Sequence, residues 1–194
     1  MARIRTVDPE DFAPALADAV GHPTNEHRVA LGSLPGWAVR PELAVAFVAF
    51  QQRVEQAAVL PTRLRELVRL RIAFHNRCRS CMATRSGAAI ADGMTDGAVC
   101  SLERPEEADD LTDAEKAALA YADLVATDHL AVGDEHFERL RRWFDDAEIV
   151  ELGVHIGVCV GFGRIAATWD LVDHLPDAFR AADAAPWSPG VTIR

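Results

Sequence analysis

The sequence has little positive charge for its length and few cysteines. It contains 20 Lys and Arg against 30 Asp and Glu, a formal net charge of −10 at pH 7. Nucleic acids and anionic membrane surfaces both attract clustered basic residues, so we expect neither as a partner. The first ten residues hold no apolar segment, so no secretory signal is predicted. Only four cysteines occur, which in a chain without such a signal is typical of a cytoplasmic protein.

Strand patterns and long apolar runs are missing as well. No Asn-Gly or Asp-Gly turn joins two runs of alternating apolar and polar residues, and we expect no membrane-spanning helix. Helical periodicity predominates and predicts an all-α helical bundle, a single domain over residues 1–194. We expect helices at residues 8–20, 27–31, 41–58, 62–75, 78–91, 95–102, 112–127, 135–143 and 146–175, then a tail over residues 176–194 on the surface or against a neighbouring subunit.

The segment Cys78-Arg-Ser-Cys81, at the expected start of a helix, carries the most chemical information. Two cysteines three residues apart can close a reversible disulfide, and thiols in the first turn of a helix ionise easily. On an unbroken helix, Arg85 would lie one turn beyond the sulfurs and lower their pKa. The helix dipole would act most strongly on Cys78. The pattern favours thiol redox chemistry, with two merely packed cysteines as the alternative.

Other potential ligands are few. A zinc site needs four ligands, and no second Cys-x-x-Cys or closely spaced Cys/His pair completes one, so we expect no metal. No Gly-rich phosphate loop is present, and we expect no cofactor. Cys100 and Cys159 are interpreted as small buried hydrophobic residues. His155 shares a helix face with Cys159 and is either a core or interface histidine or, if that helix packs beside the Cys-x-x-Cys segment, within reach of the thiols.

Two further side chains could assist the thiols. Glu66 lies twelve residues before Cys78. It either pairs with Arg63 or Arg69 as an exposed glutamate, or points toward the thiols with a raised pKa and accepts a proton. His75 is the histidine nearest to Cys78 in sequence. It either takes part in proton transfer or is an ordinary surface or core residue.

Residues 64–73, followed by Cys78-x-x-Cys81 and a helix end at Asp92-Gly93, resemble the core of the carboxymuconolactone decarboxylase superfamily. The resemblance is to its AhpD-like alkylhydroperoxidase branch, whose motif is Glu, eleven residues, Cys-x-x-Cys, three residues, His. Glu66, Cys78 and Cys81 match that motif at its spacing, within a motif core at about residues 61–94. The resemblance implies an AhpD-like helical bundle assembled into homotrimers or homohexamers.

The same resemblance implies a thiol-dependent peroxidase or disulfide oxidoreductase that reduces alkyl hydroperoxides through a Cys78–Cys81 cycle. Cys81 would attack the peroxide and become a sulfenic acid, Cys78 would resolve it to the disulfide, and Glu66 would manage protons. A thioredoxin-like or lipoyl-bearing protein would then reduce the disulfide. This order of attack differs from the dipole argument, which favours Cys78 as the nucleophile.

The chain departs from the motif at Arg85, where the family has its histidine. Arginine stays protonated at working pH, so it cannot relay a proton, although it can stabilise a thiolate or hold an anionic substrate. Two alternatives therefore stay open. One is a non-redox acid/base enzyme of the carboxymuconolactone decarboxylase type, and the other is a non-catalytic redox-sensing oligomer.

Overall fold

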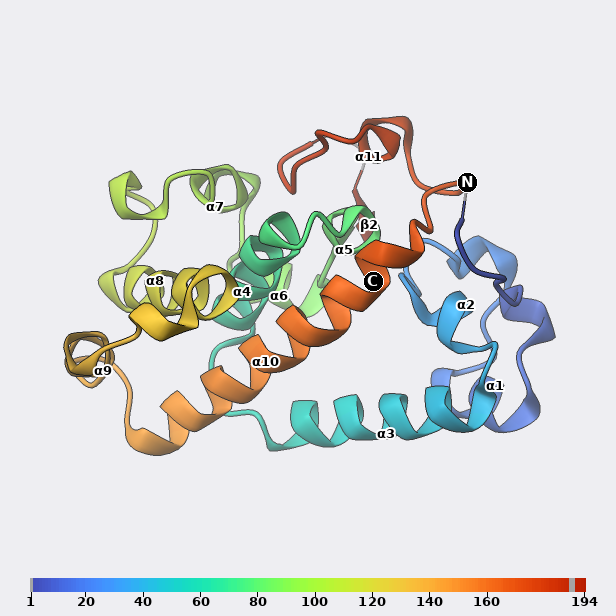
Figure 1. Cartoon of the computed structure of the whole chain (residues 1–194), viewed down its shortest axis with the longest axis horizontal. Helices are drawn as coiled ribbons and strands as arrows, with labels where there is room; N and C mark the ends of the chain where they lie inside the picture. Colours follow the sequence, from blue (N-terminus) through green and yellow to red (C-terminus); the bar gives the residue numbers. More distant parts are fainter. Residues whose placement is uncertain (1, 189–190) are drawn as a thin grey trace.

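The computed structural model describes residues 2–188 and 191–194 (Figure 1). Over these residues the protein consists of helices, the loops that connect them and two short strands, which confirms the all-α prediction. The strands are β1 (Thr84–Arg85) and β2 (Thr192–Ile193). The α-helices are α1 (Pro14–Val20), α2 (Leu34–Trp37), α3 (Pro41–Ala57), α4 (Thr62–His75), α5 (Arg79–Met82), α6 (Gly87–Ala91), α7 (Asp96–Ser101), α8 (Asp113–Thr127), α9 (Asp134–Leu140), α10 (Asp146–Trp169) and α11 (Asp177–Arg180).

Helix α4 forms the centre of the fold and has the bounds that its sequence predicts. Most of its apolar side chains are buried, among them Leu67, Leu70 and Ile72, and the helix packs against α8 and α10. The helix also carries four arginines, and each one pairs with a carboxylate. The pairs are Arg63–Glu115, Arg65–Glu55, Arg69–Glu66 and Arg71–Asp123.

The N-terminal region packs as a separate cluster in which α1 lies against α3. The single helix expected over residues 8–20 is wrong, because a 3-10 turn at Pro9–Asp11 is separated from α1. A residue before proline is driven out of the helical region, and Ala13, before Pro14, is extended with ψ 142°. The helix expected over residues 27–31 is also wrong. A 3-10 turn at Asn25–His27 and α2 take its place.

Helix α10 crosses the molecule diagonally above α3 (Figure 1). It ends at Trp169, earlier than predicted, because Asp170 takes a left-handed conformation with φ 57° and binds Arg79 of α5. By length and composition alone α10 is long and apolar enough to cross a membrane, a test that a core helix also passes. It packs against α4 and α8 and carries Glu148, Glu151 and Arg164.

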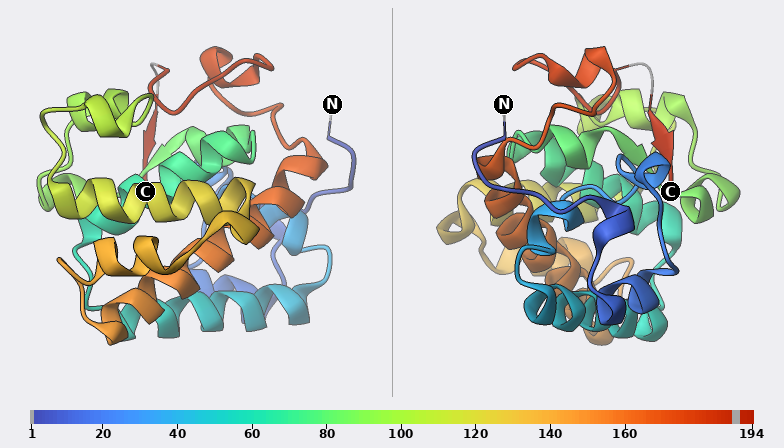
Figure 2. Two further views of the ribbon diagram at one scale, coloured as in Figure 1. Left: turned by 60° about the vertical axis from the view of Figure 1, so that its left-hand side comes forward. Right: turned by 90° about the vertical axis from the view of Figure 1, so that its right-hand side faces the viewer.

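The largest departure concerns the helix expected over residues 78–91. The chain forms α5, then β1, and restarts as α6 at Ser86, whose hydroxyl caps the new helix by accepting from Ala89 N–H. Strand β1 pairs in parallel with β2 from the C-terminal tail. In both views of Figure 2 this tail lies over one end of the molecule, beside the segment that contains α5. The expected surface position of the tail is therefore wrong in part, because Phe179 and Ala184 are buried against the Cys-x-x-Cys segment.

Candidate functional site

Cys78 and Cys81 form a disulfide at the turn between α4 and α5. Arg77, with a left-handed φ of 52°, reverses the chain after α4, and the Cys78 N–H donates to Ala73 O at 3.0 Å. The two Cα atoms lie 5.2 Å apart, within the range that a disulfide bridges. Cys78 is fully buried, whereas Cys81 is partly exposed. An incoming molecule therefore meets Cys81 first.

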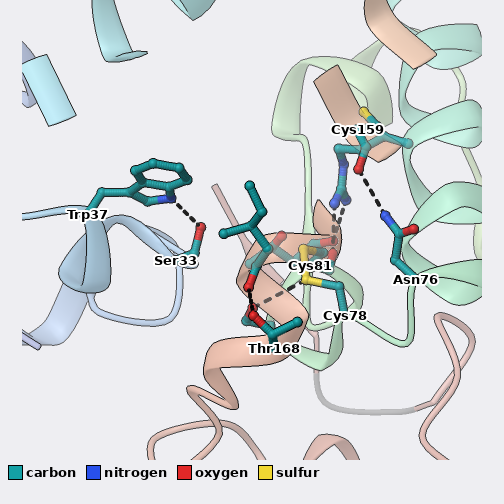
Figure 3. The surroundings of a disulfide bond; sticks show 11 residues. Ser33, Trp37, Asn76, Cys78, Cys81, Cys159 and Thr168 are labelled. Atoms are coloured by element: carbon teal, nitrogen blue, oxygen red, sulfur yellow. Dashed lines mark hydrogen bonds between the residues drawn. A yellow bond between two sulfur atoms is a disulfide. The ribbon is translucent and has the colours of Figure 1, made fainter. Parts of the chain in front are cut away.

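Cys81 lies in the wall of a cavity of about 350 Å³. One part of this cavity is aromatic, with the rings of Trp37, Phe47 and Phe162 packed on one another at centroid distances of 4.3 to 5.6 Å. Figure 3 shows Trp37 on one side of the disulfide and Cys159 of α10 on the other. The cavity thus has an aromatic part, and Cys81, whose sulfur can be oxidised and reduced, lies in its wall.

Glu66 is buried, as the hypothesis of an inward-pointing glutamate required, but its protonation behaviour is the reverse of that hypothesis. Its carboxylate accepts two hydrogen bonds from Arg69, at 2.6 and 2.7 Å, and one from Ser86 N–H at 2.9 Å. Burial by itself would raise the pKa of Glu66, but the charge and hydrogen bonds of Arg69 lower it to about 2. The raised pKa of that hypothesis is wrong, the pairing with Arg69 that the alternative predicted is present although the glutamate is buried rather than exposed, and the group is an anion at neutral pH.

Arg69 connects Glu66 to the disulfide segment. Its Nη1 donates to Cys81 O at 2.7 Å and its Nη2 donates to Thr84 O at 3.0 Å, while its other bonds hold Glu66. The guanidinium therefore lies between the carboxylate and the backbone that carries Cys81. Arg194, the residue after β2, places a second guanidinium 3.7 Å from Glu66 Oε2.

Arg85 does not occupy the position expected from an unbroken helix. It lies on β1, is buried, and donates to the carbonyls of Met82 (2.8 Å), Thr84 (2.9 Å) and Pro186. Burial, followed by the charge of Arg69, lowers the pKa of Arg85 to about 10, so it remains a cation at neutral pH. It is absent from the described lining of the cavity that contains Cys81, and its contacts fasten the C-terminal tail to the Cys-x-x-Cys segment.

His75 faces α8 rather than the disulfide. Its Nε2 lies 2.7 Å from Asp123 Oδ1, beside the ion pair of that aspartate with Arg71. The pKa of Asp123 is lowered, because the hydrogen bonds from His75 and Arg71 outweigh the effect of its burial. The structure gives His75 no place in the described lining of the Cys81 cavity.

The other two cysteines differ from each other. Cys100 is exposed, so its interpretation as a buried residue is wrong. Cys159 is partly buried and lines the same cavity as Cys81, and burial raises the pKa of its thiol to about 11. His155, one turn earlier on α10, donates from Nε2 to Arg65 O at 2.8 Å. Burial lowers the pKa of His155, which agrees with a neutral core histidine.

Sequence reasoning missed the parts of the site that come from distant segments. Arg194 and Trp37 both line the cavity with Cys81, yet neither follows a spacing that relates it to the Cys-x-x-Cys motif. The Glu66–Arg69 pair, in contrast, has the i, i+3 spacing that predicts a contact on one helix.

Fold and site together define an all-helical protein with a Cys-x-x-Cys disulfide on the wall of an amphipathic cavity and a buried Glu–Arg pair behind it. Residues 41–124 match the carboxymuconolactone decarboxylase family. This matched segment contains the Cys-x-x-Cys motif, and the chain as a whole has the AhpD-like helical fold that the motif predicts.

Three individual proteins are similar to this chain, one in sequence and two in structure. The chain is 25% identical over 131 residues to the uncharacterized protein YdfG of Bacillus subtilis (strain 168), covering 67% of this chain and 88% of that protein. The crystal structure of an AhpD core, an uncharacterized peroxidase-related protein from Ralstonia eutropha JMP134, superposes with a TM-score of 0.74 at 18% identity, over 95% of this chain and 97% of that one. The crystal structure of a variant of the debrominase Bmp8 in complex with 2,3,4-tribromopyrrole gives a TM-score of 0.70 at 22% identity, over 94% and 96% of the chains.

Proposed function

We propose that the protein is a thiol-dependent peroxidase of the AhpD-like type, which reduces alkyl hydroperoxides through a Cys78–Cys81 redox cycle. The observation that carries the proposal is the unequal exposure of the two linked cysteines beside a cavity. Cys81 is partly exposed on the cavity wall, and Cys78 is buried directly behind it. This arrangement suits an attacking sulfur that meets substrate and a resolving sulfur that does not.

The cycle balances with two thiols and one peroxide. The Cys81 thiolate attacks the terminal peroxide oxygen, the O–O bond breaks, and the released alkoxide takes a proton to become the alcohol. Cys81 is then a sulfenic acid, and the Cys78 sulfur displaces its hydroxyl as water to form the disulfide. An external dithiol, from a thioredoxin-like or lipoyl-bearing protein, reduces that disulfide and becomes oxidised itself.

The charged residues support the thiolate rather than transfer protons. Arg69 and Arg194 line the cavity with Cys81, and positive charge near a thiol favours its ionised form. Glu66 holds Arg69 in place through two hydrogen bonds. Because the pKa of Glu66 is lowered to about 2, we assign it this positioning role. Arg85 contributes by anchoring the tail that carries Arg194.

A second candidate uses the same dithiol on a brominated aromatic substrate. Two thiols and an aryl bromide would give the debrominated ring, hydrogen bromide and the disulfide. The two thiols thus supply two electrons, as they do in peroxide reduction. Two observations favour this candidate. The compartment beside Cys81 is lined by Trp37, Phe47 and Phe162, and Bmp8, described as a debrominase, has a similar fold.

We also propose that the protein acts as a homotrimer or homohexamer in the cytoplasm. One face of α10 supports the oligomer, because Val150, Val154 and Ile165 are 66%, 43% and 44% exposed. A Cβ atom at Gly157, on the same face, would meet nothing within 4 Å. Light scattering coupled to size-exclusion chromatography measures the subunit number directly.

Mass spectrometry of the reduced protein tests the function. A stoichiometric amount of cumene hydroperoxide or 2,3,4-tribromopyrrole is added, and thiols are quenched over time. We expect rapid, selective formation of the Cys78–Cys81 disulfide with one of the two oxidants, and the faster one identifies the reaction. Cys81→Ser should abolish the reaction, Cys78→Ser should stop it at a trappable sulfenic acid with peroxide, and Cys100→Ser, a matched surface control, should react normally.

If both thiols survive as long as free glutathione under these conditions, the redox proposals are wrong. The acid/base enzyme and the redox-sensing oligomer then become the leading hypotheses. A change of subunit number between oxidised and reduced protein, without turnover, would identify the sensor.

A further inference from the structure

The charged groups in the cavity beside Cys81 are all of one sign. The only charged residues along its described lining are Arg69 and Arg194, although the whole chain has a formal charge of −10. Glu66 faces a neighbouring polar pocket of about 300 Å³, in whose wall both arginines also lie. Within the described lining, no Asp or Glu side chain therefore lies on the side of the arginines that meets Cys81.

The two arginines differ in how many of their donors are already used. Arg69 makes four hydrogen bonds, to Glu66, Cys81 O and Thr84 O. Within the described part of the chain, the guanidinium of Arg194 has one ion-pair contact, 3.7 Å from Glu66 Oε2, which is longer than a direct hydrogen bond. The pKa of Arg194 is lowered, chiefly by the charge of Arg69 and then by burial, while the charge of Glu66 acts in the opposite direction.

The backbone of Arg194 is nevertheless firmly held. Its N–H donates to Arg85 O at 2.9 Å and its carbonyl accepts from Gly87 N–H at 3.0 Å. Two residues earlier, the Thr192 N–H donates to Ala83 O at 2.8 Å. Strand pairing thus fixes the backbone while the guanidinium donors stay available, as a preorganised anion-binding side chain requires.

We propose that Arg194, with Arg69 behind it, binds the carboxylate of an amphiphilic organic acid whose apolar body lies against Trp37, Phe47 and Phe162. This inference rests on the proposed function for its chemistry, because it places a reactive group of that acid beside Cys81. It names the substrate class as a small aromatic or aliphatic carboxylate that carries the hydroperoxide or halogen. The sequence left two roles open for Arg85, stabilising a thiolate or holding an anionic substrate, and we assign the second role to Arg194 instead.

The cavity size agrees with such a ligand. Its volume of about 350 Å³ falls at the lower end of the ~300–1,000 Å³ typical of small-molecule sites. The aromatic cluster supplies apolar contact, and a guanidinium matches the planar, bidentate geometry of a carboxylate. A neutral substrate of the same shape would lose that charge-assisted contact.

Calorimetry on the disulfide form tests the binding without any reaction. The probes are 3-phenylpropionate and its neutral amide, 3-phenylpropionamide. We expect the acid to bind at least about tenfold more tightly than the amide. Arg194→Gln should remove that preference, Arg194→Lys should retain part of it, and the control Arg53→Gln, an equal change of charge on the exposed face of α3, should leave it unchanged. Circular dichroism checks that each variant is folded.

Equal binding of acid and amide, or no measurable binding of either up to millimolar concentration, would overturn the proposal. A preference for the acid that persists in Arg194→Gln would overturn the assignment of this residue. The result is separable from the proposed function. If Cys81 reacts with neutral cumene hydroperoxide but the protein binds acid and amide equally, only this inference is wrong. If the protein prefers the acid but its thiols are inert, only the proposed function is wrong.

Discussion

Replacing Glu66 by Gln tests the central electrostatic feature of the site. Glu66 is 4% exposed, and its carboxylate holds the guanidinium of Arg69 with bonds of 2.6 and 2.7 Å. The substitution keeps the shape of the side chain but removes its charge, and so leaves a buried arginine without its partner. Breaking a buried ion pair in this way typically costs about 3–5 kcal/mol.

The pKa of Glu66 gives a second measure of the same interaction. It falls from an ordinary 4.5 to about 2 on folding, and at about 1.4 kcal/mol per pKa unit this corresponds to roughly 3 kcal/mol of stability. Because the folded pKa is lowered, this stability is fully present above about pH 4.5. It is lost as the pH falls from there through about 2, below which the carboxylate is protonated in both states.

Urea unfolding of the disulfide form, followed by circular dichroism at one protein concentration, measures the loss. We expect Glu66→Gln to reduce the free energy of unfolding by about 3 kcal/mol at pH 7 and by about 2 kcal/mol at pH 3.5. Glu55→Gln is the matched control. Its carboxylate pairs with Arg65 on the surface at 64% exposure, so about 0–1 kcal/mol is expected. A loss below about 1 kcal/mol for Glu66→Gln at pH 7 would refute the buried pair.

Two further predictions concern groups around the site. In reduced protein at pH 8, iodoacetamide should label the exposed Cys100 well before Cys159. The raised pKa of Cys159, about 11, leaves only about 0.1% of it as thiolate at that pH. Equal labelling rates in the folded protein would contradict the burial of Cys159. Arg85→Gln should speed amide hydrogen exchange at Thr192, because the tail loses the bond from Arg85 to a tail carbonyl. Arg53→Gln, an exposed control on α3, should leave that exchange unchanged. Unchanged exchange in Arg85→Gln would show that the tail is held without Arg85.

Local sequence determined most of the helices and the chemical motif. The predicted bounds of α4 agree with the structure, and those of α3, α7, α8 and α9 lie within three residues of it. Helix formation depends on neighbouring residues, so a cap such as Thr112, which accepts from Glu115 N–H, is visible in a short stretch of sequence. The Cys78–Cys81 pair is equally local, since three residues of spacing bring the two sulfurs into bonding range.

The largest error arose where a segment with a helical pattern pairs with a distant part of the chain. Residues 78–91 read as one helix, yet residues 84 and 85 pair with a strand more than one hundred positions later. That pairing moved Arg85 away from the sulfurs and onto the carbonyl of Pro186. The spacing of residues along one helix cannot predict a partner that only the folded chain brings close.

The sequence by itself therefore determined an all-helical subunit, a dithiol at a helix start and a glutamate at the family spacing. Only the tertiary structure decided that Glu66 has a lowered pKa, and so is a poor proton acceptor, because its pKa depends on the placement of Arg69 and on burial. The tertiary structure also decided which arginine meets the cavity beside Cys81. Arg194 reaches it through the β1–β2 pairing, a long-range contact for which no local pattern exists.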